Sequence, residues 1–419
     1  MTKKVIILSI VLSIALFSVA LAVVAPTHPA TAFDFQPQDI FRLYYGSTRA
    51  LSFGGACYVN GNDLGALLFN PAEVMTMPDG NLGISGITAN GALEAQYAEA
   101  TITSREATGE KAIETFTLVP TDSIVFYPTF AGIKLGSLAI MYSKPYFIPV
   151  YRRFDTDQTI TAPDGYSISY NQFAFYDNFS DFNIYSAVLG VGNKILTGGI
   201  RASYFNGPRV RYVRGISSDN EDYWYRKESI NYNGYTVDAG AMINLFILKA
   251  GVVYKNAASN INYTKTGEWA DTYDGGYYSQ DSTTTGTLIN APYIVGSVGV
   301  GTKNLKAEIS AYDLDPQALQ EGTISAAGIA VGGEASISIL QVRVGARMPY
   351  GKFMDFVDDP NQVALILSDP GVHLSFGIGA SLGPIQADVA FGKNVLMKTL
   401  NDGDLGNYWS INTGINFLF

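Results

Sequence analysis

The last thirteen residues of the chain, 407–419, alternate between two kinds of side chain. Because successive side chains of a strand point to opposite faces, this pattern predicts a strand with one apolar and one polar face. The polar face carries Ser410, Asn412, Gly414 and Asn416. Thr413 is the single polar residue on a face otherwise formed by Trp409, Ile411, Ile415, Phe417 and Phe419.

The same period of two recurs at 305–312, 340–348, 372–382 and 385–391. One such segment is a weak signal, but many in regular succession are typical of a β-barrel whose outward side chains contact lipid. The aromatic end of the last strand is also typical of bacterial outer-membrane barrels. We therefore expect Phe419 to be recognised by the barrel-assembly machinery.

Short connections alternate with long polar ones, as they do at the two rims of an outer-membrane barrel. We expect short links near 136, 192–194, 246–247, 302–304, 336–338 and 383–384. We expect long loops at 149–181, 207–234, 257–288, 349–370 and 393–407, and a shorter one at 315–322. We expect thirteen strands from Ser123 to the C-terminus. The segment from Gly80 to Thr103, interpreted as one strand bent at Gly91, adds a fourteenth. A hairpin in that segment would give fifteen, against the even number expected.

The predicted fold is all-β: a membrane-spanning antiparallel up-and-down barrel of about fourteen strands over residues 80–419. Its predicted location is the bacterial outer membrane, with lipid around the wall. The alternative is a soluble secreted β-propeller or sandwich.

The first 32 residues have the features of a secretory signal. Lys3 and Lys4 precede an apolar run, and Ala30-Thr31-Ala32 precedes a predicted cleavage site before Phe33. A cut after Ala22 is the alternative site, and an uncleaved anchor helix is the alternative role. No other stretch approaches the roughly 20 apolar residues of a spanning helix.

Residues 33–79 lack the alternation. Asn62-Asp63 before Leu64 predicts a capped short helix that ends at Asn70-Pro71. A unit of about 45 residues has little core of its own, so we expect it to be stable when it lies inside the barrel.

The segment STRALSFGGACYVNGNDLGALLFNPAEV resembles the start of the FadL-type outer-membrane family, whose N-terminal hatch carries an Asn-Pro-Ala motif and plugs a fourteen-stranded barrel. The motif corresponds to Asn70, Pro71 and Ala72. Arg49-Ala50, Gly54-Gly55-Ala56 and Asp63 complete the pattern of the broader branches, which include the PorV-like proteins. Segments 306–315 and 342–351 are similar to the final-hairpin segments of those branches.

The resemblance implies passive uptake of hydrophobic small molecules such as long-chain fatty acids. The ligand would meet the extracellular loops, enter a lumenal pocket and leave sideways through a gap in the wall, while the hatch moves. PorV-like relatives share the architecture but carry secreted proteins, so the alternative is a non-conducting barrel that binds secreted proteins or organises the envelope.

Five residues are candidates for ligand binding or gating: Asn70, Pro71, Ala72, Arg343 and Arg347. Asn70 could hydrogen-bond to the backbone of the barrel wall while Pro71 fixes the local turn, or the pair could simply end a helix. Arg343 and Arg347 fall on a polar strand face. They could receive a ligand carboxylate, or form ion pairs with Glu308, Asp388 or the hatch.

Composition excludes other classes. Charged residues make up 15% of the chain, below the roughly 25% of soluble domains. The net charge of −10 argues against nucleic acid as a partner. We found no motif for a nucleophile, a metal or a phosphate, and therefore expect neither an enzyme nor a cofactor. The single cysteine, Cys57, excludes an internal disulfide and is expected to be a small buried apolar residue.

Overall fold

The computed structural model describes residues 46–89, 102–105, 110–113, 125–144, 152–154, 158–161, 167–178, 182–217, 223–273, 276–288, 292–314, 326–351, 353–354, 373–392 and 411–419. The predicted signal, residues 1–32, and residues 33–45 of the predicted hatch region lie outside these ranges.

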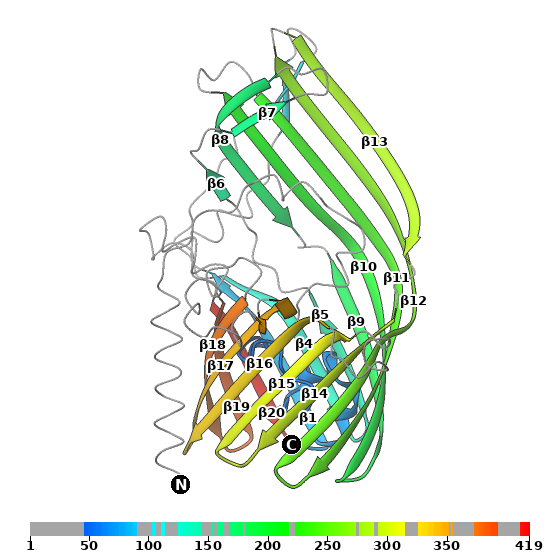
Figure 1. The fold of residues 1–419 in the computed structure, drawn as a ribbon, viewed down its shortest axis with the longest axis vertical. Coiled ribbons are helices and arrows are strands. Elements are labelled where there is room, and N and C mark those ends of the chain that lie inside the picture. Colours follow the sequence, from blue (N-terminus) through cyan, green and yellow to red (C-terminus); the bar gives the residue numbers. More distant parts are fainter. Residues whose placement is uncertain are drawn as a thin grey trace.

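Fourteen antiparallel strands form a closed barrel (Figure 1). Each strand pairs with the next, and the last, β20, pairs with β1, which closes the ring and excludes the sandwich alternative. In ring order the strands are β1 (Gly80–Ala89), β4 (Val125–Leu135), β5 (Leu138–Ser143), β9 (Asn183–Gly192), β10 (Leu196–Ser217), β11 (Tyr223–Leu245), β12 (Leu248–Tyr273), β14 (Tyr293–Gly301), β15 (Leu305–Leu314), β16 (Ala326–Ile337), β17 (Leu340–Pro349), β18 (His373–Leu382), β19 (Ile385–Gly392) and β20 (Ile411–Leu418).

The side chains alternate between the two faces of the wall as the sequence predicts. On β20, Asn412, Gly414 and Asn416 are buried inside, whereas Ile415, Phe417 and the terminal Phe419 are exposed. The same contrast around the ring gives an apolar outer belt that faces lipid.

Among the described residues, no helix combines the length and the apolar character needed to cross a bilayer.

Three strands continue far beyond the others: β10, β11 and β12 have 22, 23 and 26 residues (Figure 1). We call their upper parts, residues 207–217, 223–232 and 263–273, together with β8 (Ser167–Asn178) and β13 (Gly276–Leu288), the extension. β8 pairs with β10, and β13 pairs with β12. Two short strands, β6 (Arg152–Phe154) and β7 (Gln158–Thr161), pair with β8.

The prediction of loops at 207–234 and 257–288 is therefore wrong, since most of these residues are strand, and the stretch 149–181 also contains β6, β7 and β8. Among the residues whose burial is described, polar ones such as Asn231, Thr264 and Thr285 are exposed on the outward strand face, whereas Ile230 and Ile261 are buried on the inner face. Thr and Tyr also favour strands.

The first barrel strand is shorter than predicted. β1 ends at Ala89, and Ile102 and Thr103 belong to β2 (Ile102–Arg105), which forms a separate hairpin with β3 (Glu110–Ile113). Gly91, the predicted bend, lies outside the described ranges. The strand count of fourteen is unaffected and is confirmed.

Residues 46–79 fill the barrel interior, shown in blue within the lower part of the ring in Figure 1. We call this segment the hatch. It contains α2 (Thr48–Ser52) and two 3₁₀ helices, η3 (Leu64–Leu68) and η4 (Pro71–Met75). Ser47, Asp63 and Asn70 are the respective N-caps, each accepting a backbone N–H with its side chain. The predicted capped helix at Leu64 is thus present as η3, and Pro71 begins a further helix.

Candidate functional site

The hatch shares one apolar core with the barrel wall. Phe53, Leu64, Leu67 and Val74 of the hatch pack in a cluster that includes wall residues such as Phe130, Val188 and Val295. Cys57 is buried in the same cluster, as predicted. A segment too small to fold around its own core therefore gains burial from the wall.

Glu308 of β15 holds the hatch by its backbone. Its carboxylate accepts hydrogen bonds from three successive hatch amides, at 2.6 Å from Tyr58, 3.3 Å from Val59 and 2.9 Å from Asn60. The hydroxyl of Ser297 donates to the same carboxylate at 2.8 Å. Four donors, three of them hatch backbone amides, therefore converge on one wall carboxyl group.

Two cations hold the end of η3. Arg201 of β10 and Lys255 of β12 both donate to the Leu68 carbonyl, at 2.6 and 2.8 Å. The carboxylate of Asp238 pairs with both cations, so their charge is compensated inside the barrel.

A third group connects Arg49 of the hatch with the wall. Arg49 forms an ion pair with Glu334 of β16, which also pairs with Lys306 at 3.0 Å and with Arg343 at 2.7 Å. Arg343 in turn pairs with Asp388 of β19. Removing one member would leave a buried charge uncompensated, which is costly.

Two further contacts come from β4 and β20, strands on either side of β1 in the ring. The Lys134 ammonium donates to the Pro78 carbonyl at 2.8 Å, and the Thr48 hydroxyl donates to Asn412. The polar anchors of the hatch thus come from β4, β10, β12, β15, β16 and β20, distributed around the barrel.

The Asn-Pro-Ala segment is bonded within the hatch. Asn70 donates to the Tyr58 carbonyl at 2.7 Å and accepts the amide of Ala72 at 3.0 Å. These bonds go to hatch backbone, in contrast to the predicted bond to the wall backbone. Asn70 therefore orders the hatch itself, and all three residues of the motif are buried.

Glycines of the wall make room for this segment. A Cβ added at Gly240 would lie 2.2 Å from Asn70 Oδ1, and one at Gly199 would lie 2.4 Å from the Pro71 carbonyl oxygen. No side chain fits there, so the hatch backbone rests directly on the wall backbone.

Arg343 and Arg347 both face inward but differ in environment. Arg343 is fully buried, with its guanidinium paired to Glu334 and Asp388. This is the ion-pair alternative of the sequence analysis. Arg347 is half-buried, and its guanidinium lies 4.2 Å from the centre of the Tyr312 ring.

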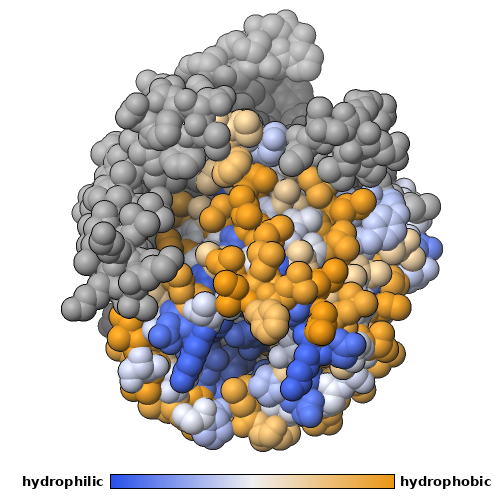
Figure 2. Space-filling model, turned by 60° about the horizontal axis from the view of Figure 1, so that its bottom comes forward, coloured by the Kyte–Doolittle hydropathy of each residue, from blue (hydrophilic) through white to orange (hydrophobic). Residues whose placement is uncertain are grey.

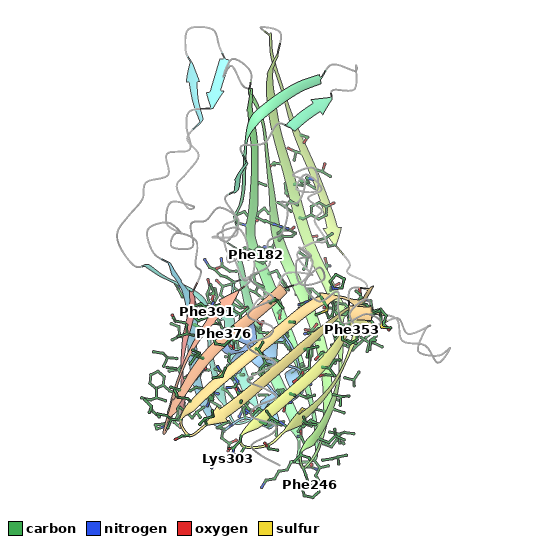
Figure 3. All side chains as sticks on the ribbon, turned by 60° about the vertical axis from the view of Figure 1, so that its left-hand side comes forward. Phe182, Phe246, Lys303, Phe353, Phe376 and Phe391 are labelled. Carbon is green, nitrogen blue, oxygen red and sulfur yellow. The ribbon has the colours of Figure 1, made fainter. Side chains whose placement is uncertain are left out.

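A second apolar cluster lies on the inner side of the wall, above the hatch. Its buried members are Phe182, Ile184, Phe205, Ile230, Tyr232 and Ile261, and we call it the upper cluster. The Phe182 ring lies 6.2 Å from Phe205 and 5.6 Å from Tyr232. Phe205 is four residues along β10 from the hatch anchor Arg201, or about 13 Å. Figure 3 shows Phe182 above the barrel, at the opposite end from Phe246 and Lys303.

The other end of the barrel has a different surface. Figure 2 shows hydrophilic residues gathered in a recess at this end, with hydrophobic residues of the outer belt around it.

Burial shifts the pKa of several titratable hatch groups, among them Asp63 and Cys57. Burial raises the pKa of the Asp63 carboxyl to about 6, against the smaller opposing effect of Arg49. Burial also raises the pKa of the Cys57 thiol well above its usual value. The Asp63 carboxylate accepts hydrogen bonds from the Ser47 hydroxyl and, at 3.2 Å, from the Ala66 amide.

Sequence reasoning missed Glu334, Lys255 and Lys134. Glu334 lies on the small-residue face of β16, where Gly328, Ala330 and Gly332 are also buried. The alternation of small buried residues with exposed ones along this strand could have assigned Glu334 to the inner face. Within the described residues no group of His, Cys, Asp or Glu comes together as a metal site would require.

No family model matches the chain, and no curated protein matches it. Among solved structures it is similar to the CymD monoaromatic hydrocarbon channel, with 9% identity, a TM-score of 0.48 and coverage of 89% of this chain and 97% of that one. It is similar to the Ralstonia pickettii toluene transporter TbuX, with 10% identity, a TM-score of 0.48 and coverage of 90% and 98%. It is also similar to the P. putida toluene transporter TodX, with 12% identity, a TM-score of 0.45 and coverage of 88% of this chain and 97% of that one.

Proposed function

We propose that this protein is an outer-membrane channel for passive uptake of hydrophobic small molecules, gated by its hatch. The main support is the arrangement along β10, β11 and β12: the extension comes first, then the apolar upper cluster, and then a hatch held by hydrogen bonds and ion pairs. Short turns then face the periplasm and the extension faces outward.

The upper cluster is the proposed contact for an incoming solute. An apolar molecule gains free energy when it leaves water for aromatic and aliphatic surface. Long-chain fatty acids and small aromatic hydrocarbons are both suitable by this chemistry. Neither class requires a reaction at the wall, and we propose no enzymatic role or cofactor.

The hatch is the proposed gate. Its anchors are hydrogen bonds and ion pairs to backbone and side chains, which can exchange partners without breaking covalent bonds. A ligand that binds better to a displaced hatch would increase the population of that state by its difference in affinity.

The decisive experiment measures transfer of a labelled long-chain fatty acid, and of labelled toluene, into liposomes containing the purified protein. Wild type should accelerate transfer of at least one probe over empty liposomes. Phe205→Ala should slow transfer, because it removes an aromatic ring of the upper cluster. Tyr254→Ala is the matched control, since this aromatic residue points outward and is 43% exposed. Wild-type transfer equal to that of empty liposomes would refute the proposal.

A second variant tests the gate. Glu308→Gln weakens the acceptor for three hatch amides and should increase transfer or ion leakage through the barrel. Asp313→Asn is the control, because this carboxylate lies on the same strand but is exposed. Equal behaviour of the two variants would exclude gating at this anchor.

The second candidate function is a non-conducting barrel that binds secreted proteins. The extension favours it, because three strands of more than 20 residues provide a large surface beyond the membrane. In this case neither probe would be transferred, and secreted proteins would copurify from the native envelope.

A further inference from the structure

A row of tyrosines crosses the outward face of the wall in register. Tyr142 pairs with Tyr185, Tyr185 with Tyr204, and Tyr204 with Tyr235. Tyr185, Tyr204 and Tyr235 are 49%, 42% and 49% exposed. Tyrosines arranged in this way mark the level where a barrel leaves the hydrocarbon and enters the head groups of the bilayer.

The next row, two residues further along each strand, consists mainly of asparagines in place of tyrosines. Asn183 pairs with Asn206, Asn206 with Asn233, Asn233 with Asn262, and Asn262 with Thr287. The step from tyrosine to asparagine is about 7 Å along the strand. The asparagine row therefore lies next to the tyrosine row, on the side away from the hydrocarbon belt.

The rows beyond it continue in the same way. Asn231 of β11 pairs with Thr264 of β12, which pairs with Thr285 of β13. One row further, Thr266 pairs with Thr283. We call the exposed members of these rows the amide-hydroxyl face: Asn206, Asn231, Asn233, Asn262, Thr264, Thr266, Thr283, Thr285 and Thr287.

The side chains of this face are partly ordered by one another. Thr287 donates to Asn262 at 2.9 Å, and Asn233 donates to the Tyr204 hydroxyl at 3.0 Å. Neighbouring strands are about 4.8 Å apart and successive rows about 7 Å apart, so donors and acceptors recur at regular intervals on the sheet.

None of the nine residues of the face is charged, and the register places Lys227, Glu268 and Asp281 one row further along the strands. Arg209 and Lys265 belong to the opposite strand face, whereas Lys144, two residues beyond Tyr142, lies at the register position next to Asn183, at the β5 end of the asparagine row. Lipid phosphates are recognised by Arg and Lys, so a phosphate is a poor match for this surface. Neutral hydroxyl-rich groups match it, because amides and hydroxyls both donate and accept hydrogen bonds.

We propose that the amide-hydroxyl face binds the saccharide chains of glycolipids in the outer leaflet of the membrane. The position of the face beyond the tyrosine row is the reason for choosing this ligand, because the saccharide chains of outer-leaflet glycolipids surround the wall there. The tyrosines below add apolar ring faces against which sugar rings can pack. The inference rests on the proposed outer-membrane location and is independent of transport.

The test uses the purified full-length protein in detergent and, as probe, the oligosaccharide released from lipopolysaccharide by mild acid, which carries no acyl chains. Binding is measured by saturation-transfer NMR and titration. The triple variant Asn206→Ala, Asn233→Ala, Asn262→Ala should weaken binding about tenfold, because three hydrogen-bonding groups are lost. Asn304→Ala, an exposed asparagine in the β14–β15 turn at the other rim, is the control and should bind as wild type does.

A dephosphorylated sample of the same oligosaccharide should bind equally well, since none of the nine residues of the face is a cation. Heat-modifiable gel mobility confirms that the triple variant is folded. Absence of wild-type binding, equal binding by the triple variant, or loss of binding on dephosphorylation would each overturn the proposal. Transport of the apolar probes is unaffected by these outcomes, so this proposal can fail while the proposed function stands.

Discussion

At the scale of single residues, the hatch is ordered by its caps and fitted to the wall by glycines. Asn70 bonds to the Tyr58 carbonyl and to the Ala72 amide of the hatch, while Gly199 and Gly240 leave space for Pro71 and Asn70. The motif is thus bonded within the hatch, and β10 and β11 carry glycine where they contact it.

The glycine contact gives a direct prediction. Gly199→Ala should displace the hatch, because the new Cβ would lie 2.4 Å from the Pro71 carbonyl oxygen. We expect a loss of about 1 to 3 kcal/mol in the free energy of unfolding, typical of overpacking. Labelling of Cys57, the single thiol of the chain and buried in the hatch, should also become faster.

The neighbouring glycine is the control. At Gly198 the closest atom to an added Cβ is the Gly240 carbonyl oxygen at 3.8 Å, an ordinary contact. Gly198→Ala should therefore leave both thiol labelling and unfolding close to wild type. Similar effects of the two substitutions would argue against close packing of the hatch on the wall.

The buried carboxyl of Asp63 predicts a pH dependence. Its pKa in the folded protein is about 6, above the ordinary value of 3.8, so the folded state binds the proton more tightly than the unfolded state. The contribution of Asp63 to stability is therefore greatest below pH 4 and is lost as the pH rises through 6. Asp63→Asn removes this titration.

The measurement is the difference in unfolding free energy between wild type and Asp63→Asn, taken at pH 4 and at pH 7. We expect wild type to lose about 1 to 3 kcal/mol relative to the variant over this range. Comparing the two proteins at each pH cancels the titration of all other groups. A constant difference would contradict the raised pKa.

At the scale of elements, the extension is a set of strands that pair mainly with one another. Above Asn206, β10 leaves its pairing with β9 and pairs with β8 instead. The fourteen-strand ring below is closed by other pairings. Barrel formation and the extension are therefore separable.

Shortening the β10–β11 hairpin should preserve the barrel. Arg209 and Ile230 are paired, so residues 210–229 can be replaced by Asn-Gly, which closes a two-residue turn. We expect this variant to fold and to keep heat-modifiable gel mobility. A deeper cut that joins Arg201 to Asp238 should prevent folding, because it removes wall at the level of the tyrosine row. Failure of the shallow cut would show that the extension is needed for assembly.

At the scale of the whole molecule, the closed ring makes the barrel resistant to partial unfolding. Every barrel strand has two neighbours, so no edge is available where detergent can begin to separate strands. The hatch adds a filled interior with shared core and buried ion pairs.

We therefore expect the protein to migrate faster on a denaturing gel without boiling than after boiling. The unboiled barrel stays compact, whereas boiling breaks the ring and lets the chain expand. Circular dichroism of both samples checks that the shift follows loss of strand. Identical mobility of a sample shown to be rich in strand would contradict a closed and stable barrel.

The sequence alone determined the strand count, the inward and outward faces, and a hatch segment outside the pattern. Period-two alternation is local, and it persists wherever one strand face meets lipid and the other meets protein. Arg343 and Glu308 could be assigned to the inner face for this reason. The polar outward face of the extension was misinterpreted as loops, because polar residues in strands exposed to water resemble loop composition.

Only the tertiary structure decided which inward residues meet. Glu308 lies 250 residues from Tyr58 in the chain, and Lys255 lies 187 residues from Leu68. No local pattern encodes these partners, because they depend on ring closure, strand register and the depth of the hatch. The same applies to the amide-hydroxyl face, whose rows exist only once five strands are aligned side by side.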